Sequence, residues 1–123
     1  MALRIPALLA LLCATLAATA PAMADPAGGE AIYRQRCQMC HGKPGTPSPL
    51  GPSLSGVIGR KAGSTTFNHS PALRQSGIVW SRAALDRFLA APQKAVPGTK
   101  MVIALPDPAQ RKAVLDFLAR LPR

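Results

Sequence analysis

The chain has 123 residues, of which 15 are Lys or Arg and 5 are Asp or Glu, and its formal net charge at pH 7 is +10. This length allows one small domain, and a single Trp, a single Tyr and three Phe leave little bulk for a hydrophobic core. The basic residues are scattered, without a clustered run or an aromatic platform, so the sequence argues against nucleic acid and favours an acidic protein partner.

The first 24 residues have the pattern of a secretory signal peptide. Arg4 precedes an apolar stretch over residues 5–20, and the small-residue pattern Ala22-Met23-Ala24 follows it. The apolar stretch is shorter than the ~20 residues that span a bilayer. We therefore predict a signal peptide over residues 1–24 that is cleaved after Ala24, export to the periplasm without stable membrane insertion, and a mature domain over residues 25–123. An uncleaved membrane anchor is the alternative.

The mature chain is predicted to begin with a helix. Asp25 suits the N-cap and Pro26 the first helical position, and Ile32, Tyr33 and later Cys37 and Cys40 recur at helical spacing. The first helix therefore delivers the two cysteines.

Residues 42–66 contain too many Pro and Gly for regular elements. A loop of this length in a compact domain normally has a function. Because a domain so small and rich in loops usually needs internal support, we expect the loop to wrap a bound group.

Three further helices are predicted in the second half of the chain. Ser70 starts a short helix that Gly77 ends, Ser81 caps a helix that closes at Pro92, and the last helix begins at Asp107. The last helix buries an apolar stripe at steps of three and four: Val114, Leu115, Phe117, Leu118 and Leu121. No alternating strand pattern competes, so the predicted fold class is all-α, with short helices and long loops.

Residues 37–41 read CQMCH, a spacing that suits a redox disulfide, half of a zinc site or the anchor of a covalently held haem. A thioredoxin-like disulfide needs a βαβ pattern that this sequence lacks. Structural zinc wants four ligands, and the mature chain offers only Cys37, Cys40, His41 and His69. On a helix Cys37, Cys40 and His41 share one face, so the thiols can bond the haem vinyl groups while the imidazole ligates the iron. The motif favours haem.

The identity of the second axial ligand indicates whether a haem protein transfers electrons or binds and converts small molecules. Met39 lies between the two cysteines and is poorly placed for the opposite face of the haem. Met101 remains, in VPGTKM, where Pro97 and Gly98 can turn the chain inward. His69 is the alternative second ligand.

A series of motifs runs along nearly all of the predicted mature chain: GGEAIYRQRCQMCH, GPSLSGVIGRKAG, F-x-x-S at residues 67–70, SGIVW, PGTKM and RKAVLDFL. Together these motifs resemble the class I cytochrome c family, in particular its mitochondrial cytochrome c and bacterial cytochrome c2 branch. The resemblance implies a small all-α fold around one covalently bound haem c, with His41 and Met101 as the axial iron ligands. It also implies that the carbonyl of Pro52 orients the His41 ring.

The resemblance extends to the haem periphery and to the helix packing. It implies that Gly29 and Tyr33 on the first helix meet Phe117 on the last. It further implies a set of haem-propionate contacts: Arg60, His69, Trp80 and Thr99.

Three positions depart from the pattern of the family. His69 stands where a tyrosine usually lies near a propionate, Ile103 stands where a phenylalanine usually shields the haem edge, and Phe88 replaces a tyrosine near the methionine ligand.

The function that the resemblance implies is that of a monomeric one-electron carrier rather than an enzyme. Its iron would alternate between Fe(II) and Fe(III), and its partners would be acidic redox proteins, such as a quinol-cytochrome c reductase, a terminal oxidase, a photosynthetic reaction centre or a dehydrogenase. Arg36, Lys94 and Lys100 are expected near the exposed haem edge. The alternatives are a dedicated haem subunit of a dehydrogenase complex and a haem peroxidase or ligand-binding protein in which Met101 is not bound.

Overall fold

The computed structural model describes residues 26–46 and 48–123 of the chain, and this part is built from six helices. The predicted signal peptide and its cleavage site lie outside the described residues. The helices are α1 (Pro26–Arg36), α2 (Gln38–His41), α3 (Pro71–Gln75), α4 (Arg82–Ala90), α5 (Pro92–Ala95) and α6 (Pro108–Leu118). Apart from one isolated bridge between Lys61 and Val79, the described residues form no strands, which confirms the all-α prediction.

Three helices begin where side-chain caps were expected, whereas Asp25, the expected cap of the first helix, lies outside the described residues. Ser70 accepts a hydrogen bond from the backbone N–H of Leu73 at 3.1 Å, and Ser81 accepts one from Ala84 at 3.1 Å. Asp107 caps α6 through the N–H groups of its second and third residues. These bonds satisfy donors that a helix start leaves without an intrahelical partner, so local sequence fixes three helix starts.

Three features of the helices differ from the prediction. The last helix ends at Leu118, so Leu121, expected in its buried stripe, lies beyond the helix and is only half-buried. The first helix ends at Arg36 and a separate turn, α2, begins after Cys37, whose φ of −117° departs from the helical value of about −63° while its ψ of −39° stays helical. A further short helix, α5, follows α4 directly and begins at Pro92. None of the helices in the described ranges has the length and apolar content needed to cross a bilayer.

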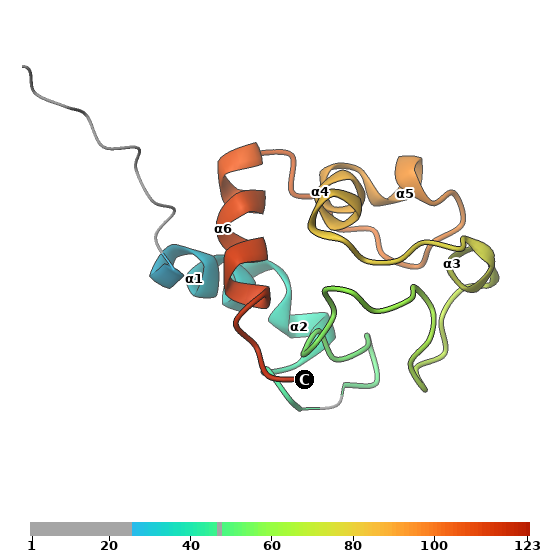
Figure 1. Ribbon diagram of the computed structural model, residues 1–123, viewed down its shortest axis with the longest axis horizontal. Helices are drawn as coiled ribbons and strands as arrows, with labels where there is room; N and C mark the ends of the chain where they lie inside the picture. The colour runs from blue at the N-terminus through green and yellow to red at the C-terminus, as the bar shows by residue number, and fades with distance from the viewer. Residues whose placement is uncertain (1–25, 47) are drawn as a thin grey trace, which may run out of the picture.

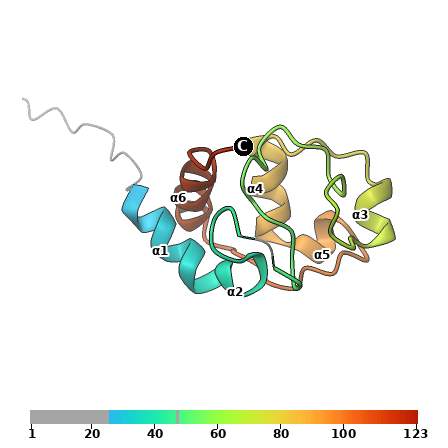
Figure 2. The same ribbon diagram turned by 90° about the horizontal axis from the view of Figure 1, so that it is seen from below.

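The molecule has α1, α2 and α6 at one end and α3 and α5 at the other, with α4 between them (Figures 1 and 2). At the α1–α6 crossing the backbones meet at Gly29, where an added Cβ would overlap the carbonyl oxygen of Ala113. The Tyr33 and Phe117 rings pack there with centroids 5.3 Å apart. The Tyr33 hydroxyl also donates to the Gly42 carbonyl at 2.7 Å, which ties the start of the long loop to α1.

Candidate functional site

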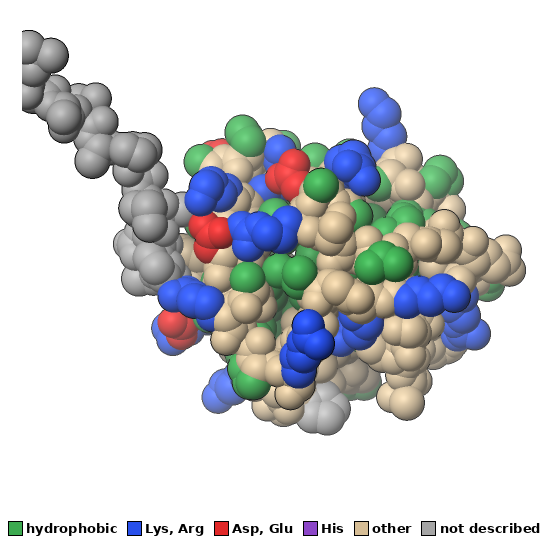
Figure 3. Space-filling model, in the orientation of Figure 1, with side chains coloured by type: hydrophobic (Ala, Val, Ile, Leu, Met, Phe, Trp, Pro, Cys, Tyr) green, Lys and Arg blue, Asp and Glu red, His purple; other side chains and the backbone are tan. Residues whose placement is uncertain are grey.

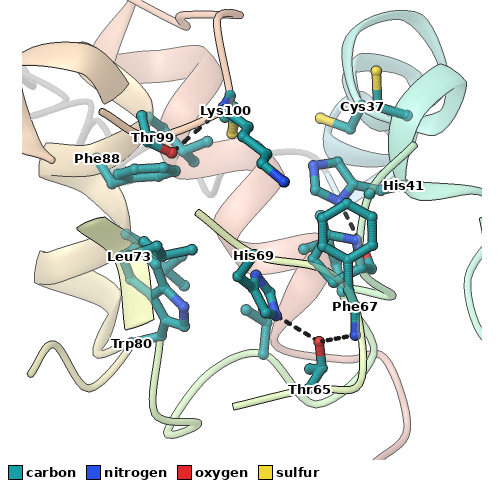
Figure 4. Close-up of a pocket in the computed structure, with 18 of the residues that line it drawn as sticks. Cys37, His41, Thr65, Phe67, His69, Leu73, Trp80, Phe88, Thr99 and Lys100 are labelled. Carbon is teal, nitrogen blue, oxygen red and sulfur yellow. Dashed lines mark hydrogen bonds between the residues drawn. The ribbon is translucent and has the colours of Figure 1, made fainter. Parts of the chain in front are cut away.

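A cavity opens between the two ends of the molecule, and every residue that the sequence analysis assigned to a bound haem lines it. Its walls come from α1, α2, α3, α4 and α6, the loop over residues 50–70, Trp80 between α3 and α4, and the loop between α5 and α6. Figure 4 shows Cys37 and His41 on one side of this cavity and Thr99 and Lys100 on another, with Trp80 and Phe88 below Thr99. The lining residues from the sequence prediction are Cys37, Cys40, His41, Pro52, Arg60, His69, Trp80, Thr99 and Met101.

The His41 ring is held by the loop that follows it. Its Nδ1 lies 2.8 Å from the carbonyl oxygen of Pro52, so Nδ1–H donates and the Nε2 lone pair stays available. A Cβ on Gly51 would lie 3.1 Å from Nδ1 and 2.9 Å from the Cys40 carbonyl oxygen, so glycine is what lets this loop approach the ring. Burial lowers the pKa of His41 below its ordinary value, which favours the neutral imidazole that can ligate a metal.

The two cysteines of the motif are free thiols at the edge of the same cavity. Burial raises the pKa of Cys37 to about 11, and neighbouring Cys40 acts in the same direction, so the Cys37 thiol is neutral at neutral pH. Within residues 26–46 and 48–123 no cluster of three or more His, Cys, Asp or Glu side chains could hold a metal ion. The four donors of the zinc alternative are therefore not assembled in this part of the chain.

Polar side chains gather at the part of the cavity formed by residues 60–80. His69 is 6% exposed and its Nε2 lies 2.7 Å from the Thr65 hydroxyl oxygen. Arg60 is half-buried and donates to the carbonyls of Ser53 and Ser55 at 2.9 and 3.2 Å. Trp80 is buried, and its ring packs on Phe88 with centroids 5.0 Å apart.

Positive charge surrounds His69. Burial lowers the pKa of His69 below its ordinary value of 6.5, and the nearby charges of Arg74, Arg60 and Lys100 lower it further, in that order. Protonated His69 therefore adds a fourth positive charge to a region that already has three, and a bound anion would relieve this repulsion.

Met101 reaches the cavity from the loop between α5 and α6. Its side chain is half-buried and packs against the hydrophobic core. Thr99, buried and two residues earlier, accepts a hydrogen bond from the Met101 N–H through its hydroxyl at 3.4 Å. Met39, by contrast, is 81% exposed and is not among the residues that line the cavity.

The charges of the described residues are unevenly distributed. Their four acidic side chains are all engaged away from the cavity: Glu30 with Arg34, Asp86 with Arg111, Asp116 with Arg82 and Lys112, and Asp107 as a helix cap. In Figure 3 the red acidic atoms gather toward the end formed by α1 and α6, whereas blue basic side chains spread over the whole face. Arg36, Lys61 and Lys100 line the cavity, and Lys94, expected near the exposed haem edge, lies on α5 outside the lining.

Sequence reasoning missed three residues of the site. Thr65 orients His69, Phe67 packs edge-on to the His69 ring with centroids 5.3 Å apart, and Gln93 bonds the loop that carries Met101. Phe67 is an aromatic residue within a polar stretch, which is a usable signal. Thr65 and Gln93 have no comparable signal, because their roles depend on contacts with other segments.

Comparisons with known proteins agree on one family. The family model described as cytochrome c matches residues 26–122. Cytochrome c2 of Rhodomicrobium vannielii is 45% identical over 105 residues, covering 83% of each chain, and cytochrome c2 of Rhodoblastus acidophilus is 40% identical over 99 residues, covering 78% of this chain and 92% of that protein. The solved structure of cytochrome cH from Methylobacterium extorquens superposes with a TM-score of 0.71 at 39% identity and covers 77% of this chain and 97% of its own.

Proposed function

This chain belongs to the cytochrome c family, whose members carry single electrons on one covalently bound haem c, and we propose that it does so as a soluble periplasmic protein between larger redox complexes. The observation that carries the proposal is the meeting of Cys37, Cys40, His41 and Met101 at a single cavity, although Met101 is 60 or more residues away in sequence. A reversible one-electron titration of the purified protein tests it. A protein without such a couple would contradict it.

We assign covalent attachment to Cys37 and Cys40 and axial ligation to His41 and Met101. The donor set fits the group: the His41 ring is oriented through Nδ1 with Nε2 available, and the Met101 thioether belongs to a loop on another wall. When bound, the haem supplies an iron that alternates between Fe(II) and Fe(III), and thioether ligation favours the reduced state. The chain's own part is to hold both ligands in place and to limit the access of water.

We assign Arg60, His69, Trp80 and Thr99 to the haem propionates. A buried carboxylate is costly without hydrogen-bond donors, and these four residues give the cavity a guanidinium, an imidazole, an indole N–H and a hydroxyl. The repulsion among Arg60, Arg74 and Lys100 around His69 supports the assignment, since anionic groups would offset it.

Export and the domain boundary are further parts of the proposal. Residues 1–24 act as a signal peptide and residues 25–123 form the haem domain. Determination of the N-terminal residue of the protein recovered from the periplasm tests both, and a mature protein that begins elsewhere than Asp25 would correct the boundary.

The partner is proposed to be an acidic redox protein that docks at the mouth of the cavity. Arg36 and Lys100 lie there among exposed apolar side chains, Leu50, Val102 and Ile103. Because the acidic side chains of the described residues are paired elsewhere, this region keeps a positive potential. An apolar centre with basic neighbours suits a small, transient contact.

Electron transfer to such a partner should depend strongly on salt. Electrostatic steering raises association rates by roughly 10 to 1,000-fold at low ionic strength, so the second-order rate constant should fall steeply as salt is added. The double variant Arg36→Gln, Lys100→Gln should flatten the slope of the rate constant against ionic strength. Stopped-flow measurements with an acidic redox protein in increasing NaCl provide the test.

The matched control for this prediction is Arg34→Gln, Lys112→Gln. It removes the same charge from exposed residues that pair with acidic groups on α1 and α6. Native-like slopes in both double variants would place the docking surface away from the cavity mouth.

His69 should make the midpoint potential depend on pH. Protonated His69 disfavours the more positive ferric state, so the potential should be higher at acid pH and decline as pH rises through the pKa of His69. Burial and the charges of Arg74, Arg60 and Lys100 lower that pKa, whereas an anionic propionate beside the ring would raise it, so we expect the change within the range from pH 5 to 9 that the titration covers. Two unit charges ~8 Å apart at an effective dielectric of ~20 interact by about 2 kcal/mol, or roughly 90 mV for one electron, an upper bound that solvent reduces.

A redox titration of the native protein and of His69→Tyr between pH 5 and 9 measures the effect. Tyrosine keeps a hydrogen-bond donor at this position, as a hydroxyl in place of the ring N–H, but does not titrate in this range. Equal pH slopes in the two proteins would remove His69 from the haem site.

A further inference from the structure

The loop that carries Met101 is held mainly by side chains. Among the described residues, the backbone of residues 100–104 makes no backbone-to-backbone hydrogen bond. The nearest such bonds flank the segment: Thr99 N–H donates to Val96 at 3.0 Å, and Leu105 N–H donates to Leu89 at 2.7 Å. The position of Met101 between these two bonds therefore depends on which side chains reach its loop.

Gln93 makes two of these side-chain bonds. Its Nε2 donates to the carbonyl of Thr99 at 2.7 Å and to the carbonyl of Met101 at 3.1 Å. A side-chain amide has only two N–H donors, so both are used on this one loop, on either side of Lys100. The orientation of the amide is unambiguous, because only its nitrogen can donate to a carbonyl.

The helix that carries Gln93 is anchored in the hydrophobic core. Gln93 belongs to α5, a single turn whose neighbouring residues Pro92 and Val96 are buried. Gln93 itself is exposed, so its side chain is not needed to fill the core. Arg36, at the end of α1, makes another side-chain bond to the loop of Met101. It donates to the Ala104 carbonyl at 3.1 Å.

We infer that Gln93 is a positioning residue that keeps Met101 in the cavity and sets how readily its thioether withdraws. The inference rests on the proposed role of Met101 as an axial ligand. An external ligand competes for the iron only while the methionine is withdrawn, so its apparent affinity follows the population of the open loop. Weakening the hold of Gln93 enlarges that population.

Two substitutions separate the loss of the two hydrogen bonds from the repulsion between a carboxylate and the two carbonyls. Gln93→Glu keeps the size of the side chain but replaces the NH2 group, and with it both donors, by a carboxylate oxygen that faces two carbonyls. Gln93→Ala removes the side chain and lets water bond the carbonyls. Gln35→Glu is the matched control, because it makes the same chemical change at an exposed position of α1 that does not line the cavity.

The experiment titrates the ferric holoprotein with imidazole, followed by its visible spectrum. Gln93→Glu should lower the apparent dissociation constant for imidazole by about tenfold and Gln93→Ala by about threefold, whereas Gln35→Glu should stay within about twofold of native. Hydrogen exchange at the amides of residues 99–104 should accelerate in Gln93→Glu. A merely structural role would lower the urea midpoint and leave imidazole affinity unchanged.

Failure of the inference about Gln93 can be distinguished from failure of the assignment of Met101. If the native ferric protein shows the absorption band at the red end of the spectrum that Met–iron ligation produces, but imidazole affinity in Gln93→Glu is within twofold of native, the inference about Gln93 is wrong and the assignment of Met101 stands. If the native protein lacks that band, the assignment of Met101 fails and the inference fails with it.

Discussion

The Met101→Ala variant is expected to keep its covalent haem and to lose the low-spin His/Met spectrum completely. The proposed attachment is through Cys37 and Cys40, at the start of α2 and within it, and does not involve the loop of Met101 between α5 and α6. Alanine has no donor atom, so the iron loses the thioether that stabilises its reduced state, and the midpoint potential should fall. Denaturing mass spectrometry measures the attachment, and ferric spectra with a redox titration measure the rest.

Met39→Ala is the control, since Met39 is largely exposed and lies outside the cavity lining. It should keep the native spectrum and potential. Survival of the His/Met spectrum in Met101→Ala would show that the axial assignment is wrong. If Met101→Ala instead stays low-spin without the Met–iron band, His69 is the first candidate for the second ligand, and a Met101→Ala, His69→Ala double variant would decide. A native protein without Met–iron ligation would favour the ligand-binding alternative.

The helices that the sequence predicted are those whose signals are local. Ser70, Ser81 and Asp107 cap the helices that they precede, and an apolar stripe at steps of three and four places α6 against the core. A cap and a stripe need only a few neighbouring residues. α5 has no such signal, since its N-cap Ala91 has no side-chain acceptor and the turn is held by the burial of Pro92 and Val96.

The residues of the candidate site likewise fall into two groups: those that a local sequence pattern predicts and those that it does not. The motif CQMCH brings Cys37, Cys40 and His41 together within one turn, and helical geometry alone suggests their shared face. Met101 was assigned by elimination and by resemblance, and its placement depends on the rest of the fold. The contacts that hold its loop join residues far apart in sequence, as in the hydrogen bond from Arg36 to the Ala104 carbonyl. No local sequence pattern therefore predicts them.

Replacing Gly29 by alanine is expected to lower the free energy of unfolding of the holoprotein by about 3 kcal/mol, because overpacking against a backbone forces the helices apart. The new Cβ would overlap the Ala113 carbonyl oxygen, lie 2.8 Å from its carbon and come 3.0 Å from the Cβ of Phe117. The first two atoms belong to the backbone of α6, which cannot move aside as a flexible side chain can. The Tyr33–Phe117 contact should loosen with them.

The sign of the change in unfolding free energy tests the close helix crossing, because helix propensity alone predicts that Gly29→Ala is stabilising. In the interior of an unobstructed helix, alanine in place of glycine stabilises by about 1 kcal/mol. The reciprocal control is Ala31→Gly, at an exposed position of α1 two residues away, which should cost about 1 kcal/mol through propensity without affecting the crossing. Urea unfolding of the three proteins, followed by the Trp80 fluorescence and by far-UV circular dichroism, gives the comparison. If Gly29→Ala were as stable as the native protein or more so, α1 and α6 would not cross as closely as the structure has them.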